Sequence, residues 1–193
     1  MEAIILDSNK RYTFANYLTW IDEKRRELID GFVFMMSGPT RRHQKISGRL
    51  FLRFGNYLEK KKCEVYSAPF DVRLPKNGET DNNKIYNVVQ PDIVVVCDQS
   101  KLDEKGCIGP PDLIVEILSA NTSKKDLKDK FFLYEKSGVI EYWIAYPNEK
   151  SINVFILNPK GKYELKGMYV EGDTVSPSMF LDLSLEIEDI FKM

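Results

Sequence analysis

The sequence is poor in the residues that most often build metal or redox sites. It contains one histidine, His43, and three cysteines, Cys63, Cys97 and Cys107. The cysteines show no CxxC spacing, and an odd number fits a disulfide framework poorly, so the pattern favours reduced thiols in a cytoplasmic protein. One histidine gives little support to a histidine-ligated metal. No Ser-His-Asp arrangement is indicated either.

Long apolar runs and net charge are also lacking. No stretch approaches the ~20 apolar residues that cross a bilayer, and the start, MEAIILDSNKRYTF, has no apolar segment typical of a signal peptide. Lys and Arg number 28 against 29 Asp and Glu, a formal net charge of -1. This balance excludes a general attraction to polyanions, so contact with nucleic acid needs a local basic patch. The length predicts one domain over residues 1–193.

Apolar periodicity predicts a mixed α/β domain in which helices flank a central mixed sheet. Asp30-Gly31 between two apolar runs indicates a hairpin with a type I′ turn. Thr40 is the expected N-cap of an amphipathic helix over 41–61. VVQPDIVVVC and PDLIVEIL are expected strands, and residues 119–138 an expected helix with a Ser123–Asp126 cap and Gly138 at its end. Three further strands and a short helical turn follow.

Glu116 stands out because it lies inside the apolar strand PDLIVEIL. Side chains alternate along a strand, so Glu116 shares one face with Ile114 and Leu118. An unpaired carboxylate in such a layer costs several kcal/mol, on the order of what a salt bridge or metal must return. Asp112 lies on the same face but about 13 Å away at ~3.3 Å per residue, so we expect it to be a strand-start residue.

The following helix provides a partner for Glu116. Leu127, Lys130, Phe131 and Tyr134 share one helical face, and three of these four are apolar or aromatic, so Lys130 is expected to point inward. A buried Glu116–Lys130 ion pair without a catalytic role is one reading. Asp92, which opens the preceding strand, favours another, because two carboxylates on adjacent strands can hold Mg²⁺ with water and substrate oxygens.

The ordered series VQPDIVVV and PPDLIVEILSANTSKKDLKDKFFLYEKSGVIEYWIAYP, together with ELIDGFVFMMSGPTRRHQ, resembles a large bacterial family of restriction endonuclease-like proteins in the PD-(D/E)xK nuclease superfamily. The resemblance implies a restriction-endonuclease-like core and divalent-metal phosphodiester hydrolysis. It places the metal-binding acids at Asp92 and Glu116, with the carbonyl of Ile117, and a further acid at Glu27. The superfamily lysine normally follows the second acid by two residues, where this chain has Leu118, so we expect Lys130 to have taken that role.

A second group of residues lies at the start of helix 41–61. Arg41, Arg42 and His43 form a candidate phosphate-contacting cluster, the alternative being a solvated arginine pair beside a capping histidine.

The sequence therefore predicts a nuclease that uses Mg²⁺ or Mn²⁺, acts on nucleic acid, with DNA the favoured substrate, and pairs as a homodimer because duplex cleavage needs two cuts. A non-catalytic interaction domain with the same fold is the main alternative, favoured by Leu118 and the near-neutral charge. A hydrolase of smaller phosphodiesters is the third.

Overall fold

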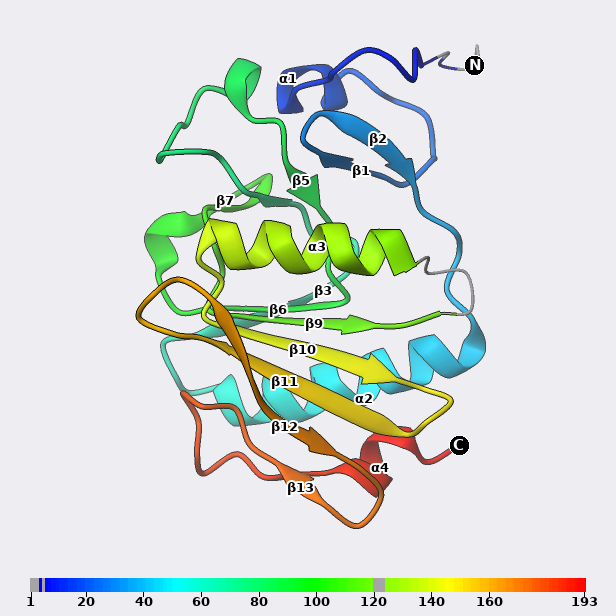
Figure 1. Ribbon diagram of the computed structural model, residues 1–193, viewed down its shortest axis with the longest axis vertical. Coiled ribbons are helices and arrows are strands. Elements are labelled where there is room, and N and C mark those ends of the chain that lie inside the picture. Colours follow the sequence, from blue (N-terminus) through cyan, green and yellow to red (C-terminus); the bar gives the residue numbers. More distant parts are fainter. Residues whose placement is uncertain (1–3, 5, 120–123) are drawn as a thin grey trace.

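The computed structural model describes residues 4, 6–119 and 124–193, without the side chains of 124–126 (Figure 1). Two six-stranded sheets and four α-helices dominate these residues. The helices are α1 (Phe14–Tyr17), α2 (Arg41–Leu58), α3 (Lys124–Ser137) and α4 (Ile187–Phe191), with 3-10 turns at Asn82–Lys84 and Gln99–Lys101. None of the described helices is long and apolar enough to cross a bilayer.

The central sheet has the strand order β12-β11-β10-β9-β6-β3. Its strands are β3 (Glu64–Ser67), β6 (Ile93–Val96), β9 (Leu113–Ile117), β10 (Glu141–Tyr146), β11 (Ser151–Leu157) and β12 (Tyr163–Tyr169). Only the β9–β10 pair is parallel, because α3 connects these two strands, and the other pairs of this sheet are antiparallel. Figure 1 shows α3 on one face and α2 on the other. The predicted mixed α/β fold with a helix-flanked central sheet is confirmed.

Periodicity explains how both helices pack. The apolar face of α2 (Ile46, Leu50, Phe54 and Leu58) is buried with Trp143 against one side of the sheet. Thr40 caps this helix, since its hydroxyl accepts a hydrogen bond from the His43 amide at 3.2 Å. The helix ends at Leu58, three residues before its predicted end at 61. On the opposite side, Leu127, Phe131 and Tyr134 of α3 pack on Ile114, Tyr142 and Ile144. Ser123 and the side chain of Asp126, the expected cap, lie outside the described residues.

A second sheet has the order β2-β1-β5-β4-β8-β7. Its strands are β1 (Arg26–Ile29), β2 (Phe32–Met35), β4 (Val72–Arg73), β5 (Val88–Val89), β7 (Leu102–Asp103) and β8 (Gly106–Ile108). A small pair, β13 (Thr174–Val175) and β14 (Leu185–Glu186), lies near the C-terminus. The predicted hairpin is confirmed: Asp30 and Gly31 have φ of 50° and 82°, as a type I′ turn requires.

The segment VVQPDIVVVC forms two strands, although the sequence predicts one. Pro91 has no amide hydrogen to donate, and β5 ends before it in the second sheet while β6 begins after it in the central sheet. The link Gln90-Pro91-Asp92 therefore passes from one sheet to the other. This crossing brings β1, which pairs with β5 through Leu28 and Val88, close to the start of β6.

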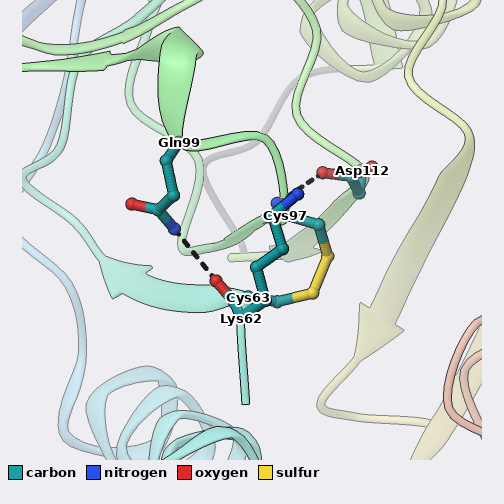
Figure 2. The surroundings of a disulfide bond; sticks show 5 residues. All are labelled: Lys62, Cys63, Cys97, Gln99 and Asp112. Carbon is teal, nitrogen blue, oxygen red and sulfur yellow. Dashed lines mark hydrogen bonds between the residues drawn. A yellow bond between two sulfur atoms is a disulfide. The ribbon is translucent and has the colours of Figure 1, made fainter.

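The expectation of three reduced thiols is wrong, because Cys63 and Cys97 form a disulfide (Figure 2). The antiparallel pairing of Glu64 with Val96 continues to these two residues, so the strand register places their side chains opposite each other. The cysteines are 34 residues apart in the sequence, and their spacing gave no sign of the pairing. Cys107 is a free, buried thiol. Reduced cysteines therefore no longer support a cytoplasmic location.

Removing the disulfide is expected to destabilise the fold by about 3–4 kcal/mol, because the bond closes a loop between residues 34 apart. Guanidinium unfolding of the Cys63→Ser/Cys97→Ser variant measures this loss. The unsubstituted protein should lose similar stability in dithiothreitol, while the double variant should not respond to the reductant. Equal stability of both proteins in both conditions would contradict a disulfide between these strands.

Candidate active site

Residues from five separate elements meet around a cavity of about 460 Å³. Glu27 comes from β1, Asp92 from the residue before β6, and Glu116 from β9. Lys130 comes from α3 and His43 from the first turn of α2. Ile117, at the end of β9, also lines the cavity. The cavity is therefore lined by every residue that was expected to bind the metal or to be catalytic.

Strand register explains why Asp92 and Glu116 meet. Strands β6 and β9 are antiparallel with Ile93 opposite Val115, so one step further along places Asp92 beside Glu116. Residues directly opposite each other project from the same face of a sheet. That face is the one covered by α3, where Val94 and Ile114 are buried. The two acids thus share one layer at the edge of the α3 interface.

Two hydrogen bonds fix the position of Asp92. Its Oδ2 accepts from the Ile117 amide at 2.7 Å and lies 3.1 Å from His43 Nε2. Burial disfavours the charged imidazolium, but the Asp92 carboxylate outweighs burial and raises the pKa of His43 above its ordinary value. His43 therefore contacts the acidic site through Asp92.

Asp112 makes the same kind of contact at the other end of the β6–β9 pair. Its Oδ2 accepts a hydrogen bond from the Cys97 amide at 2.7 Å (Figure 2). Each Pro-Asp pair therefore places an aspartate just before one strand. This aspartate accepts a backbone hydrogen bond at the end of the neighbouring strand. Asp112 does not line the cavity, which confirms it as a strand-start residue.

Lys130 connects two of the acids. Its Nζ donates to Glu27 Oε1 at 2.8 Å and to Glu116 Oε1 at 2.9 Å. The Tyr134 hydroxyl donates to the same Glu116 oxygen at 2.6 Å. Burial works against the ammonium group, but Glu116 and Glu27 outweigh it and raise the pKa of Lys130 above its ordinary value. Lys130 is therefore charged, and it links β9 to the hairpin strand β1.

Acidic side chains are crowded in the site. Three carboxylates (Glu27, Asp92 and Glu116) face the single ammonium group of Lys130. Burial, followed by the nearby charges of Asp92 and Glu27, raises the pKa of Glu116 from its ordinary 4.5 to about 7, while Lys130 and Tyr134 lower it. Crowding of buried carboxylates in a cleft is typical of functional sites.

The donor set fits a hard divalent cation. Within the described residues, the hydrogen bonds to the Asp92 carboxylate all involve Oδ2, and those to the Glu116 carboxylate all involve Oε1. Asp92 Oδ1 and Glu116 Oε2 therefore remain available, and Mg²⁺ takes one or two protein carboxylates with water as its other ligands. Among the same described residues, no group of three or more His, Cys, Asp or Glu side chains is arranged to hold a metal. A cation held by Asp92 and Glu116 would need backbone and solvent oxygens as its remaining ligands.

Arg41 and Arg42, expected with His43 to contact phosphate, lie outside the cavity, and that contact stays a prediction. Arg42 donates to Asn148 at 3.0 Å and is exposed, and Arg41 is exposed as well. Of the three, only His43 lines the cavity.

Two contributors to the site were missed by sequence reasoning: the Gln90 amide, which donates to Glu27 at 2.8 Å, and the hydroxyl of Tyr134. The helical face that identified Lys130 also contains Tyr134, so its position was predictable although its hydrogen bond was not.

Comparison with known proteins identifies the family. The model of the Uma2 family, described as "Putative restriction endonuclease", matches residues 14–188. The chain belongs to the Uma2 family. The uncharacterised protein slr1290 of Synechocystis sp. (strain ATCC 27184 / PCC 6803 / Kazusa) is 28% identical over 150 residues, which are 76% of this chain and 75% of that protein. The predicted membership of a restriction endonuclease-like family is thereby confirmed.

A solved structure supports the Uma2 fold. The crystal structure of a "putative nuclease belonging to DUF820" from Anabaena variabilis ATCC 29413 superposes with a TM-score of 0.72. The match covers 93% of this chain and 97% of the other at 21% sequence identity. At this identity the likeness establishes the fold alone. The family description, in turn, supports a nuclease-like function for this Uma2 chain.

Proposed function

We propose that the protein is a divalent-metal-dependent nuclease that hydrolyses phosphodiester bonds, with DNA as its substrate. The observation that carries the proposal is the convergence of Asp92, Glu116 and Lys130 on one cavity, with the two acids in register on adjacent strands. Family membership supports the same activity.

Each residue has a distinct proposed role. Asp92 and Glu116, with the Ile117 carbonyl, would hold Mg²⁺ or Mn²⁺. When bound, such a cation supplies Lewis-acid polarisation of the scissile phosphate. Lys130 is placed to orient the attacking water or to stabilise charge on the phosphoryl oxygens, and Glu27 holds the lysine from its other side. The water oxygen bonds to phosphorus as one ester P–O bond breaks, which leaves a phosphomonoester and a hydroxyl group.

Leu118 does not count against this assignment. It lines the cavity at the position where the superfamily lysine is expected, but it carries no charge. Lys130 reaches Glu116 Oε1 from α3, so an ammonium group is present although it comes from a different element. This contact favours the nuclease over the interaction domain.

Hydrolysis assays with and without metal test the proposal. We expect cleavage of DNA in Mg²⁺ or Mn²⁺ and none in EDTA. Cleavage of methyl p-nitrophenyl phosphate without cleavage of DNA or RNA would favour a hydrolase of small phosphodiesters. If no phosphodiester is cleaved with any divalent metal, the interaction domain is the better account.

A further inference from the structure

We propose that the cavity receives one unpaired nucleotide of a single-stranded nucleic acid, with its base against Phe51 and its phosphate beside Arg25. This inference rests on the proposed function, because the acids and Lys130 define which bond the cavity must present. It goes beyond that function by naming the form of the substrate and two residues that recognise it.

The first observation is an exposed aromatic ring beside the catalytic acids. Phe51 lies on α2 two turns after His43, and both line the cavity. The core face of α2 is buried against the sheet, yet the residue Phe51 is 39% exposed. Phe34 and Met35 of the hairpin line the same cavity. Base stacking on such a ring tolerates any base, because every base has a π face.

The second observation is the space beside that ring. Ser47 and Gly48 lie between His43 and Phe51 on α2 and line the cavity. A Cβ atom added at Gly48 would meet nothing within 4 Å. Small side chains along this face leave a volume next to Phe51 that is within the range of small-ligand sites, which span about 300–1,000 Å³.

The third observation is that the Arg25 guanidinium has a hydrogen-bond donor left unpaired by the described residues. Arg25 lines the cavity, and its Nε donates to Gln90 Oε1 at 3.0 Å. Its Nη2 is buried and has no hydrogen-bond partner among the described residues. Lys130, by contrast, already contacts two carboxylates. A phosphate in the cavity would match the charge and fork geometry of the Arg25 guanidinium.

A single strand fits this cavity better than a duplex. The side chains of Asp92 and Glu116 are only 15% and 11% exposed. The phosphates of a duplex lie along a stiff rod with a persistence length of ~50 nm, whereas a single strand can bend into a recess. Affinity for duplex DNA also depends on neutralising several phosphates, and the net charge is -1. A single-stranded substrate would also remove the reason to expect a homodimer.

Fluorescence anisotropy with a short labelled oligonucleotide tests the proposal, in EDTA and again in Ca²⁺. We expect the single strand to bind about tenfold or more tightly than its duplex. Phe51→Ala should weaken single-strand binding by about 5- to 150-fold. Arg25→Gln should reduce the salt-dependence slope for the single strand by about 0.7.

Two neighbouring substitutions serve as controls. Leu52 is exposed on the same helix outside the cavity, and Lys24 is exposed next to Arg25, so Leu52→Ala and Lys24→Gln should bind like the unsubstituted protein. The proposal is overturned if the duplex binds as tightly as the single strand, or if Phe51→Ala matches Leu52→Ala.

Hydrolysis of methyl p-nitrophenyl phosphate, which has no base, separates the two claims. If the unsubstituted protein hydrolyses methyl p-nitrophenyl phosphate but Phe51→Ala leaves single-strand binding unchanged, the phosphodiesterase activity is supported and the base pocket is contradicted. If no phosphodiester is hydrolysed but Phe51→Ala abolishes single-strand binding, the base pocket is supported and the nuclease activity is contradicted.

Discussion

Asp92→Asn is expected to reduce metal-dependent phosphodiester hydrolysis by at least about 100-fold while leaving the fold intact. The asparagine oxygen can still accept the hydrogen bond from the Ile117 amide. The substitution removes the negative charge that the proposed cation requires. Lewis-acid stabilisation of a phosphoryl transition state amounts to several kcal/mol, and each ~1.4 kcal/mol is a tenfold change in rate. Steady-state hydrolysis at saturating Mg²⁺ measures the loss.

Asp112→Asn is the matched control for this substitution. Asp112 accepts the Cys97 amide at the same 2.7 Å distance and also follows a proline, but it does not line the cavity. Its variant should keep nearly the full rate. If both variants lose activity to the same extent, the loss comes from weakened hydrogen bonds at the strand ends, and Asp92 is not a metal ligand.

Lys130→Met is expected to abolish activity and to lower the free energy of unfolding by about 3–5 kcal/mol, because removing one partner of a buried ion pair leaves uncompensated charge. Glu27 and Glu116 both lose the ammonium group that lies within 3 Å of each of them. Guanidinium unfolding in EDTA measures the change. Lys136→Met is the control, since Lys136 is exposed on the same helix.

The loss of stability in Lys130→Met should depend on pH. Burial raises the pKa of Glu116 from 4.5 to about 7 in the folded protein even with Lys130 present. An acid with a raised folded pKa is protonated in both states at low pH, and it disfavours folding increasingly as the pH passes from the unfolded to the folded pKa. Without Lys130 this penalty grows, so the deficit should be larger at about pH 8 than at about pH 5. Equal deficits at both pH values, or none, would contradict a buried Glu116–Lys130 pair.

Local periodicity predicted the parts of the site that depend on single elements. Alternation along β9 placed Glu116 on the same face as Ile114, and the helical face of α3 placed Lys130 inward. In the structure Lys130 Nζ lies 2.9 Å from Glu116 Oε1. Neither prediction required knowledge of any distant contact, because strand and helix periods fix which face a side chain occupies.

The remaining parts depend on pairings between segments distant in sequence. Glu27 reaches Lys130 only because β1 pairs with β5, and the sequence pattern merged β5 with β6 into one strand. The Cys63–Cys97 disulfide depends on the register of β3 against β6. The contact between His43 and Asp92 depends on how the start of α2 packs beside β6. Single-sequence patterns do not encode register across such distances.

The most direct test of the central claim is Mn²⁺ binding measured by calorimetry, without substrate. The account predicts saturable binding in the unsubstituted protein and in Asp112→Asn, with binding about tenfold or more weaker in both Asp92→Asn and Glu116→Gln. Absence of saturable binding in the unsubstituted protein, or equal binding in all four proteins, would contradict a cation site formed by these two acids.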